Sequence, residues 1–351
     1  MHDRTTEAID ALVAETMRAG NVPGIAVAVT EDGELTYARG HGVMNVNTRE
    51  AVTPETLFHC ASVTKTFVAT ALMQLAERGR LDLDAPVSTY LPYFRLADDR
   101  YKDITIVQML SHTSGMPDTE EYGWDQPEYD DGALERYVRS LAPLGLIAAP
   151  GERFAYSNIA FEVLGDVIAK VAGMSFEEYV HREILLPLGM TSSTLLVREA
   201  DPSLLASPHV PTASGNIVVS DIFPYNRAHA PSSTMYSSVT ELSRWALMHL
   251  NRGALGETRI LSPQVYDEMW RPWASTGDRY WPEMGLSWFL GERSGERCVA
   301  HEGADDGFKA CFILAPARRV SAVGLGNLDR MKVEDLTDAI LDVVLCPAAE
   351  G

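Results

Sequence analysis

The chain has 351 residues, of which 46% are hydrophobic, so it can bury a large core and is long enough for two domains. It is strongly acidic, with 29 lysines and arginines against 49 aspartates and glutamates and a net charge of −20. This charge would repel nucleic acid and anionic membrane surfaces, and no basic cluster offsets it, so we expect neither as a partner.

The N-terminal residues 1–7 are polar, and neither a signal-peptide core nor an apolar run of about 18 residues follows them. These features predict a cytoplasmic protein, unless the sequence is a trimmed mature form. The cysteines lack the C-x-x-C spacing of a zinc or redox site, so we expect reduced core residues. A Cys298–Cys346 disulfide is the alternative. The four cysteines are Cys60, Cys298, Cys311 and Cys346.

The first part of the chain combines one helix with strand-like runs. The expected elements are a helix over residues 5–18 and strands over 24–30, 34–39 and 42–46, with a hairpin turn at 31–33. Residues 57–61 then lead to Ser62. A long helix-forming run over 66–80 follows directly.

The middle of the chain is mostly helical. The expected helices run over 105–111 with a threonine cap, from 158 to about 172, from Ser175 to before Pro187, and from Ser238 to about 251. His112, at the end of the first of these, is expected to be structural. The acidic segment, residues 118–135, carries eight acidic side chains with Tyr122, Trp124 and Tyr129. We expect it to be a solvated loop, with a lid that attracts cations as the alternative.

Strand patterns return near the C-terminus. The expected elements are strands over 284–290, 297–301, 308–314 and 319–325 and an amphipathic helix over 332–344. Strands at both ends with helices between them predict an α/β plus all-α fold. Residues 1–81 and 251–351 would form one discontinuous α/β sheet domain. Residues 82–250 would form a mostly helical inserted domain, with the active site between the two.

The stretch Ser62-Val63-Thr64-Lys65 has the spacing of a nucleophile beside a base. Residues three apart lie on one face of a helix, about 5–6 Å from each other. Ser62 is a weak alcohol nucleophile, and Lys65 can take its proton. The site also lies at a helix start, where free N–H groups and the positive end of the dipole favour a neutral lysine and an oxyanion.

Two later segments supply the other groups that such a reaction needs. Tyr156 can relay a proton to the leaving group, and Asn158 can hold the lysine amine and a substrate amide oxygen. The segment His301-Glu302-Gly303-Ala304 is predicted to be the edge of a strand beside Ser62. The small residues Gly303 and Ala304 allow a close approach, so that a backbone N–H there and that of Ser62 form an oxyanion hole.

With these three motifs in order, the chain resembles serine hydrolases of the penicillin-binding protein and class C β-lactamase superfamily, over about residues 8–345. It is similar to the branch whose second motif is Y-x-N, here Tyr156-Ser157-Asn158. That branch includes D-alanyl-D-alanine carboxypeptidases of the Ser-Val-Thr-Lys type, family VIII esterases, and D-aminopeptidases or D-amino-acid amidases. The resemblance implies an antiparallel sheet flanked by helices.

The resemblance also implies roles for individual residues. Ser62 would carry the acyl group, Lys65 and Tyr156 would share general base and acid work, and Asn158 would position the substrate. His301 would replace the lysine of K-T-G, and the N–H groups of Ser62 and Ala304 would form the oxyanion hole. Glu302 stands where the family has a hydroxyl residue that helps to hold a substrate carboxylate, and residues 284–290 lack the arginine of the carboxypeptidases.

We therefore predict a serine hydrolase that needs no cofactor or metal and acts on a small-molecule ester, amide or short peptide. A possible negative charge at Glu302 favours a small ester or a D-amino-acid amide or peptide over a substrate carboxylate. The alternatives are a DD-carboxypeptidase or β-lactamase-like penicillin-binding protein, an acyl transferase, and a covalent sensor that does not turn over. The sequence does not specify the physiological substrate, the stereopreference or the oligomeric state.

Overall fold

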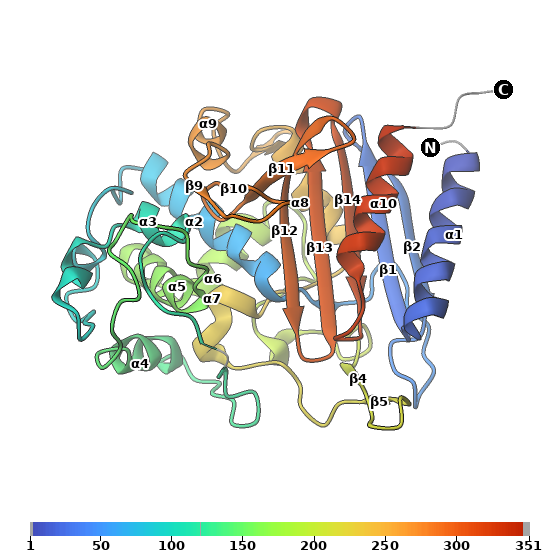
Figure 1. Ribbon diagram of the computed structural model, residues 1–351, viewed down its shortest axis with the longest axis horizontal. Coiled ribbons are helices and arrows are strands. Elements are labelled where there is room, and N and C mark those ends of the chain that lie inside the picture. The colour runs from blue at the N-terminus through green and yellow to red at the C-terminus, as the bar shows by residue number, and fades with distance from the viewer. Residues whose placement is uncertain (1–2, 120, 347–351) are drawn as a thin grey trace.

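The structure is a computed structural model that describes residues 3–119 and 121–346 (Figure 1). Its largest sheet in this part of the chain has eight antiparallel strands in the order β2-β1-β14-β13-β12-β11-β10-β9. The two ends of the chain meet in it, because β1 pairs with β14 from Ile25–Gly326 to Glu31–Val320. The strands are β1 (Gly24–Glu31), β2 (Glu34–Gly42), β9 (Ala274–Ser275), β10 (Glu283–Met284), β11 (Phe289–Arg293), β12 (Glu296–Asp305), β13 (Phe308–Ala315) and β14 (Val320–Gly326).

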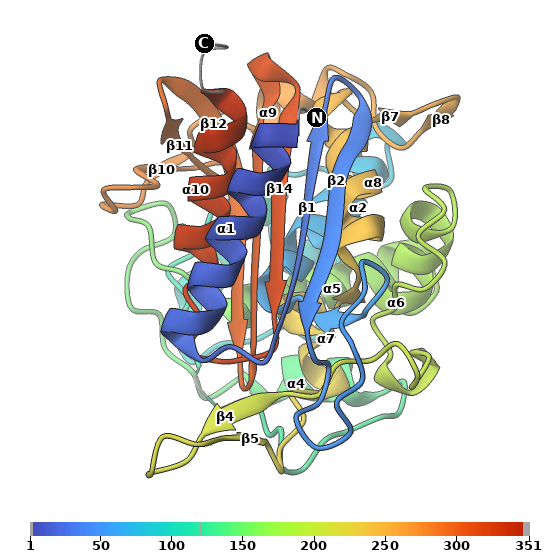
Figure 2. The ribbon, with the colours of Figure 1, turned by 90° about the vertical axis from the view of Figure 1, so that its right-hand side faces the viewer.

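Helices cover both faces of this sheet. On one face lie α1 (Asp3–Gly20) and α10 (Val333–Leu345), which Figure 2 shows packed side by side across the strands. On the other face α8 (Val239–Leu250) contacts β1 and β14. Both of these central strands are therefore buried on both sides, which explains why their sequences are apolar without alternation.

The helical region lies beside the sheet, around α2 (Figure 1). Helix α2 (Thr64–Glu77) has its residues 64–75 buried, as expected for a helix that carries few charged groups on any side. It packs against α5, α6 and α7. The remaining helices are α3 (Ile106–Leu110), α4 (Ala133–Ser140), α5 (Asn158–Ala172), α6 (Phe176–Val180), α7 (Ala230–Ser233) and α9 (Val265–Met269), and a π-helix spans His181–Leu185.

Short strand pairs complete the structure. They are β3 (Phe58–His59) with β6 (Tyr236–Ser237), β4 (His209–Pro211) with β5 (Ile217–Val219), and β7 (Ala254–Leu255) with β8 (Thr258–Arg259). The pair β3–β6 matters for function, because it joins the residues just before Ser62 to those just after α7.

The predicted fold class, an antiparallel sheet flanked by helices with an inserted helical region, is confirmed. The division into residues 1–81 with 251–351 and residues 82–250 stays a prediction. The predicted threonine cap at Thr105 and the serine caps at Ser175 and Ser238 all accept hydrogen bonds from the third residue of their helices.

Two predicted strands are wrong. Residues 42–46 do not form a third strand, because Gly42 ends β2 with a positive φ of 76° and Val43 makes only an isolated bridge to Ala51. Residues 284–290 do not form one strand either. The chain turns between β10 and β11, where Ser287 has a φ of 68° in the left-handed region.

The cysteine prediction is partly confirmed. All four cysteines are free thiols, so the alternative Cys298–Cys346 disulfide is not formed. Cys60, Cys298 and Cys311 are buried, but Cys346 is exposed and is not a core residue. No helix within residues 3–119 and 121–346 has both the length and the apolar character that crossing a membrane would require.

Candidate active site

Ser62 lies on a tight 3₁₀ turn, Ala61–Val63, that runs directly into α2. Ala61 has a φ of 45°, a left-handed conformation that is uncommon for a residue with a side chain. The turn is held by Thr64, whose Oγ1 donates to the carbonyl of Ala61 at 2.6 Å and accepts from the N–H of Met235 at 3.0 Å. The strained turn and its tie to the β6 segment fix the direction of the Ser62 side chain.

Lys65 contacts Ser62, as the three-residue spacing predicts. Its Nζ donates to Ser62 Oγ at 2.9 Å and to the main-chain oxygen of Ser232 at 2.8 Å. The side chain is fully buried, with Nζ 5.2 Å from the ring centre of Tyr156. Burial lowers the pKa of Lys65 to about 8, although nearby carboxylates oppose this shift. A lysine with such a pKa is neutral often enough near neutral pH to act as a base.

Tyr156 is held over Lys65 by aromatic neighbours. Its ring stacks on His112, with centres 4.2 Å apart, and on Phe289 at 6.4 Å. Burial raises the pKa of Tyr156, and a hydrogen bond with Ser62 partly opposes this shift. The tyrosine therefore stays protonated, which favours a hydrogen-bonded relay over a phenolate base.

His112 packs directly against the ring of Tyr156. Its Nδ1 accepts from the N–H of Ser157 at 3.1 Å, so the neutral ring carries its proton on Nε2. Burial, with the Lys65 charge adding to it, holds the pKa of His112 well below its usual value. His112 therefore supports Tyr156 directly, which agrees with the structural role expected for it.

Strand β12 passes directly beside Ser62. A Cβ atom at Gly303 would lie only 2.3 Å from the carbonyl oxygen of Cys60 and 3.1 Å from the nitrogen of Ser62, so only glycine fits here. Strand β11 pairs with β12 only as far as Ala300, so residues 301–305 have a free edge toward the cleft. The exposed residue Ala304 follows Gly303 on this edge.

His301 is buried on the same strand, and its ring donates from Nδ1 to the main-chain oxygen of Glu302 at 2.7 Å. Burial lowers the pKa of His301 to about 3, and the Lys65 charge adds to the effect. His301 is therefore neutral, and it cannot supply the positive charge of the lysine whose place it takes in the motif.

Glu302 does not face Ser62. Successive side chains of a strand point to opposite faces, and Gly303 faces Ser62, so Glu302 points to the face covered by α10. There its Oε1 accepts from the indole Nε1 of Trp281 at 3.0 Å, and its neighbour across the strands is Cys311. Burial raises the pKa of Glu302. Glu302 also lines the cleft around Ser62, so the expected effect of its charge on a substrate carboxylate stays a prediction.

Asn158 opens helix α5 and is bonded differently from the prediction. Its Nδ2 donates to both carboxylate oxygens of Asp118 at 3.1 Å and to the hydroxyl of Tyr122 at 2.7 Å. Asp118 also accepts from the N–H of Asn158 at 2.8 Å, where a carboxylate complements the positive helix end. The expected bond from Asn158 to Lys65 is replaced by the bond from Lys65 to the Ser232 carbonyl.

Asp305 is a cleft residue that our sequence reasoning missed. Its side chain is 9% exposed, and one oxygen accepts from His59 Nε2 at 2.8 Å. Residues 301, 303 and 305 share one face of β12, so strand alternation from His301 and Gly303 could have identified it. Asp118 and Tyr122 come from the acidic segment, which thus borders the site and is not only a solvated loop.

The cleft around Ser62 has a volume of about 380 Å³. Besides residues from all three motifs, it is lined by aromatic side chains and several ionisable groups. Its lining residues are Ser62, Tyr122, Tyr156, Asn158, Ser233, Phe289, His301, Glu302, Gly303, Ala304, Asp305, Lys309 and Glu334. Lys309 is the basic residue among them, and its Nζ lies 3.8 Å from the Glu334 carboxylate.

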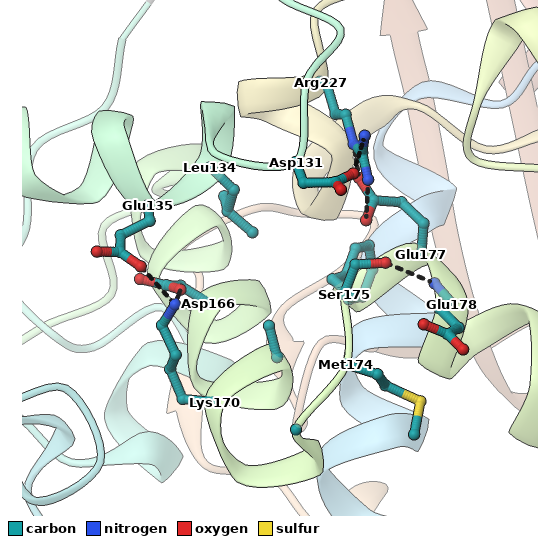
Figure 3. A pocket seen from close by; sticks show the side chains of 13 residues that line it. Asp131, Leu134, Glu135, Asp166, Lys170, Met174, Ser175, Glu177, Glu178 and Arg227 are labelled. Carbon is teal, nitrogen blue, oxygen red and sulfur yellow. Dashed lines mark hydrogen bonds and ion pairs between the residues drawn. The ribbon is translucent and has the colours of Figure 1, made fainter.

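A larger cavity of about 490 Å³ lies between α4, α5 and α6 (Figure 3). Most of its charged groups pair with each other, since Arg227 contacts both Asp131 and Glu177, and Lys170 contacts Glu135. Its serine, Ser175, is a helix cap that accepts from the N–H of Glu178. The nucleophile–base pair at Ser62 therefore makes the smaller cleft the candidate active site.

Residues 9–345 match a protein-family model described as Beta-lactamase. The chain is 31% identical over 335 residues to penicillin-binding protein 4 of Amycolatopsis lactamdurans. The matched region covers 93% of this chain and 85% of that protein. It is 28% identical over 332 residues to protein flp of Staphylococcus aureus (strain MRSA252), covering 94% of this chain but only 64% of that relative's length. Among solved structures, it is similar to the octameric penicillin-binding protein homologue from Pyrococcus abyssi, with a TM-score of 0.86, 28% identity, and coverage of 97% of this chain and 77% of that one.

Proposed function

The chain belongs to the β-lactamase family, and on that premise we propose that it is a serine hydrolase that forms an acyl-enzyme on Ser62. The observation that carries the proposal is the 2.9 Å contact between Ser62 Oγ and the buried Nζ of Lys65. An amine whose pKa is lowered to about 8, in contact with a hydroxyl on a helix start, is the arrangement of an activated nucleophile.

In the proposed reaction, Lys65 takes the proton of Ser62 as Oγ attacks the carbonyl carbon of the substrate. The negative charge on the former carbonyl oxygen is stabilised by the backbone N–H groups of Ser62 and Ala304. The bond to the leaving group then breaks, and Tyr156 donates its proton to that group while it takes the proton that Lys65 received from Ser62. Water attacks the acyl-enzyme along the same proton path, which releases the acid and restores Ser62.

For the substrate, we propose a small ester or a D-amino-acid amide or peptide. The carboxylates of Asp305 and Asp118 lie close enough to Lys65 to raise its pKa, so the field in the cleft is negative. The basic residue in the lining, Lys309, already pairs with Glu334. A neutral or amine-bearing substrate suits this field, and a carboxylate would be repelled.

A penicillin-binding protein activity, as a DD-carboxypeptidase or a β-lactamase-like enzyme, is the second candidate. The 31% identity to penicillin-binding protein 4 of A. lactamdurans favours it. An acyl transferase or a covalent sensor would use the same first step. A screen of p-nitrophenyl esters, D- and L-amino-acid anilides and nitrocefin ranks these candidates, and a burst with no steady-state turnover would identify a sensor.

The central proposal is tested with a fluorophosphonate label and peptide mass spectrometry. We expect the label on the Ser62 peptide, no label in Ser62→Ala, and loss of turnover in that variant without loss of folded structure. Ser175→Ala, which changes a helix-cap serine in the other cavity, should keep wild-type turnover. A label on another residue, or turnover by Ser62→Ala, would refute the assignment.

A further inference from the structure

A buried carboxylate lies behind the proposed base. Glu162, on the second turn of α5, has no exposed surface. Its Oε1 accepts from the hydroxyl of Ser232 at 2.6 Å and from Nδ1 of His229 at 3.0 Å. The main-chain oxygen of the same Ser232 accepts from Lys65 Nζ at 2.8 Å. Ser232 therefore links Glu162 to Lys65.

We infer that Glu162 is a positioning residue for Lys65, which acts through Ser232 and through its own negative charge. This inference rests on the proposed function, because it assigns a role in the activation of Ser62. Glu162 does not touch the substrate cleft, whose lining residues do not include it.

The hydrogen bonds explain how Ser232 would direct the base. A neutral amine has two N–H donors and one lone pair. When one N–H donates to the Ser232 carbonyl, the lone pair can face Ser62 Oγ, which is where it must accept a proton. Ser232 lies on α7, which has only four residues, so its position depends on side-chain contacts such as the bond to Glu162.

The charge of Glu162 acts on the same amine. Three carboxylates from different parts of the fold face Lys65, namely Glu162 from α5, Asp305 from β12 and Asp118 from the segment before α5. Burial lowers the pKa of Lys65, and among the three carboxylates Glu162 opposes this lowering most strongly. The neighbouring rings of His112 and His301 are neutral, because burial depresses their pKa values. Within the described residues the second oxygen of Glu162, Oε2, has no hydrogen-bond partner, so its charge is only partly compensated.

His229 connects this network to the acidic segment. Its ring packs edge-on against Tyr122 and Tyr137, with ring centres 5.2 and 4.6 Å apart. Tyr122 accepts from Asn158 in the cleft. Glu162 is thus held between the cleft wall and the helix that carries Ser232, a place that suits a role in positioning Lys65.

The test measures how fast a fluorophosphonate labels Ser62 as a function of pH, in wild type and in variants. The rate should rise with pH as Lys65 loses its proton. Glu162→Gln keeps the shape but removes the charge, so the half-maximal pH should fall by about one unit, the size of a typical shift from one nearby charge. Glu162→Asp keeps the charge but shortens the reach to Ser232. It should leave the half-maximal pH near the wild-type value and lower the plateau rate by up to about 10²-fold, the cost of a misplacement of about 1 Å.

Glu177→Gln is the matched control, because Glu177 is a buried glutamate 2.9 Å from Arg227 and faces the other cavity. It should change neither the half-maximal pH nor the plateau. If Glu162→Gln keeps the wild-type half-maximal pH, or Glu177→Gln shifts it equally, Glu162 only supports the fold. If Glu162→Gln does not fold, as judged by circular dichroism, a wild-type plateau in Glu162→Asp would overturn the inference. Absence of any label on wild-type Ser62 would instead refute the proposed function.

Discussion

Replacement of Gly303 by alanine should damage catalysis more than stability. The added Cβ would lie 2.3 Å from the carbonyl oxygen of Cys60, a contact that main-chain atoms must relieve by moving. The movement separates β12 from the Ser62 turn and opens the proposed oxyanion hole. Loss of one oxyanion donor costs about 10²–10³-fold in kcat. Overpacking of this kind costs about 1–3 kcal/mol of the free energy of unfolding.

The matched control is Gly40→Ala. There the added Cβ would also lie 2.3 Å from a main-chain oxygen, that of Val52, but on the edge strand β2 away from Ser62. With an unfolding entropy of about 2.1 cal/mol/K per residue, a loss of 1–3 kcal/mol lowers Tm by about 1.5–4 °C in a chain of this length. We expect both variants to show this fall, and only Gly303→Ala to lose kcat with a p-nitrophenyl ester. Equal activity losses in the two variants would refute the oxyanion-hole placement.

Lys65→Ala and Tyr156→Phe should each slow acylation by about 10²–10⁴-fold, and the double variant should be far less impaired than the product of the two, because both act on one proton path. A multiplicative double variant would show independent roles. Asp305→Asn should raise kcat/KM for carboxylate-bearing substrates about tenfold relative to amine-bearing ones, which is about 1.4 kcal/mol. Glu177→Gln, in the other cavity, should barely change this ratio, and an equal change would refute the assignment of the negative charge in the cleft to Asp305. For neutral esters, kcat/KM should rise with pH through the Lys65 pKa of about 8, since only the neutral amine accepts a proton. A flat profile would exclude Lys65 as the base.

Most of the fold could be predicted from local patterns. The continuous apolar run at residues 24–30 predicted a strand that the structure buries on both faces, and the caps at Thr105 and Ser238 marked real helix starts. The proximity of Ser62 and Lys65 could be predicted from their three-residue spacing at a helix start. The resemblance drawn from the three motifs is confirmed by the family match over residues 9–345.

The sequence did not settle which side chains face the cleft. A strand that is shifted by one residue exposes the other set of side chains, so the role of Glu302 depended on the register of β12 beside Ser62. Gly303 sets that register, and the structure places Asp305 on the face of β12 that meets Ser62 and Glu302 on the opposite face, although both residues line the cleft. The partner of Lys65 could not be found either, because it is a main-chain carbonyl at Ser232, and every residue has one.

The pKa of Lys65 and the preference for the charge of the substrate both follow from the same negative electric field, which the carboxylates around Lys65 create. Burial alone would make Lys65 a weak base with a still lower pKa, and Glu162, Asp305 and Asp118 bring that value back to about 8. Of these three, Asp305 lines the cleft, and Asp118 is exposed and bonded to the cleft residue Asn158. An ammonium group bound beside Asp305 would offset its charge, and Lys65 would then lose its proton more easily. A bound carboxylate would do the reverse and keep Lys65 protonated. The field thus disfavours carboxylate substrates both in binding and in activation of Ser62, whereas the buried charge of Glu162 acts on Lys65 whatever the substrate.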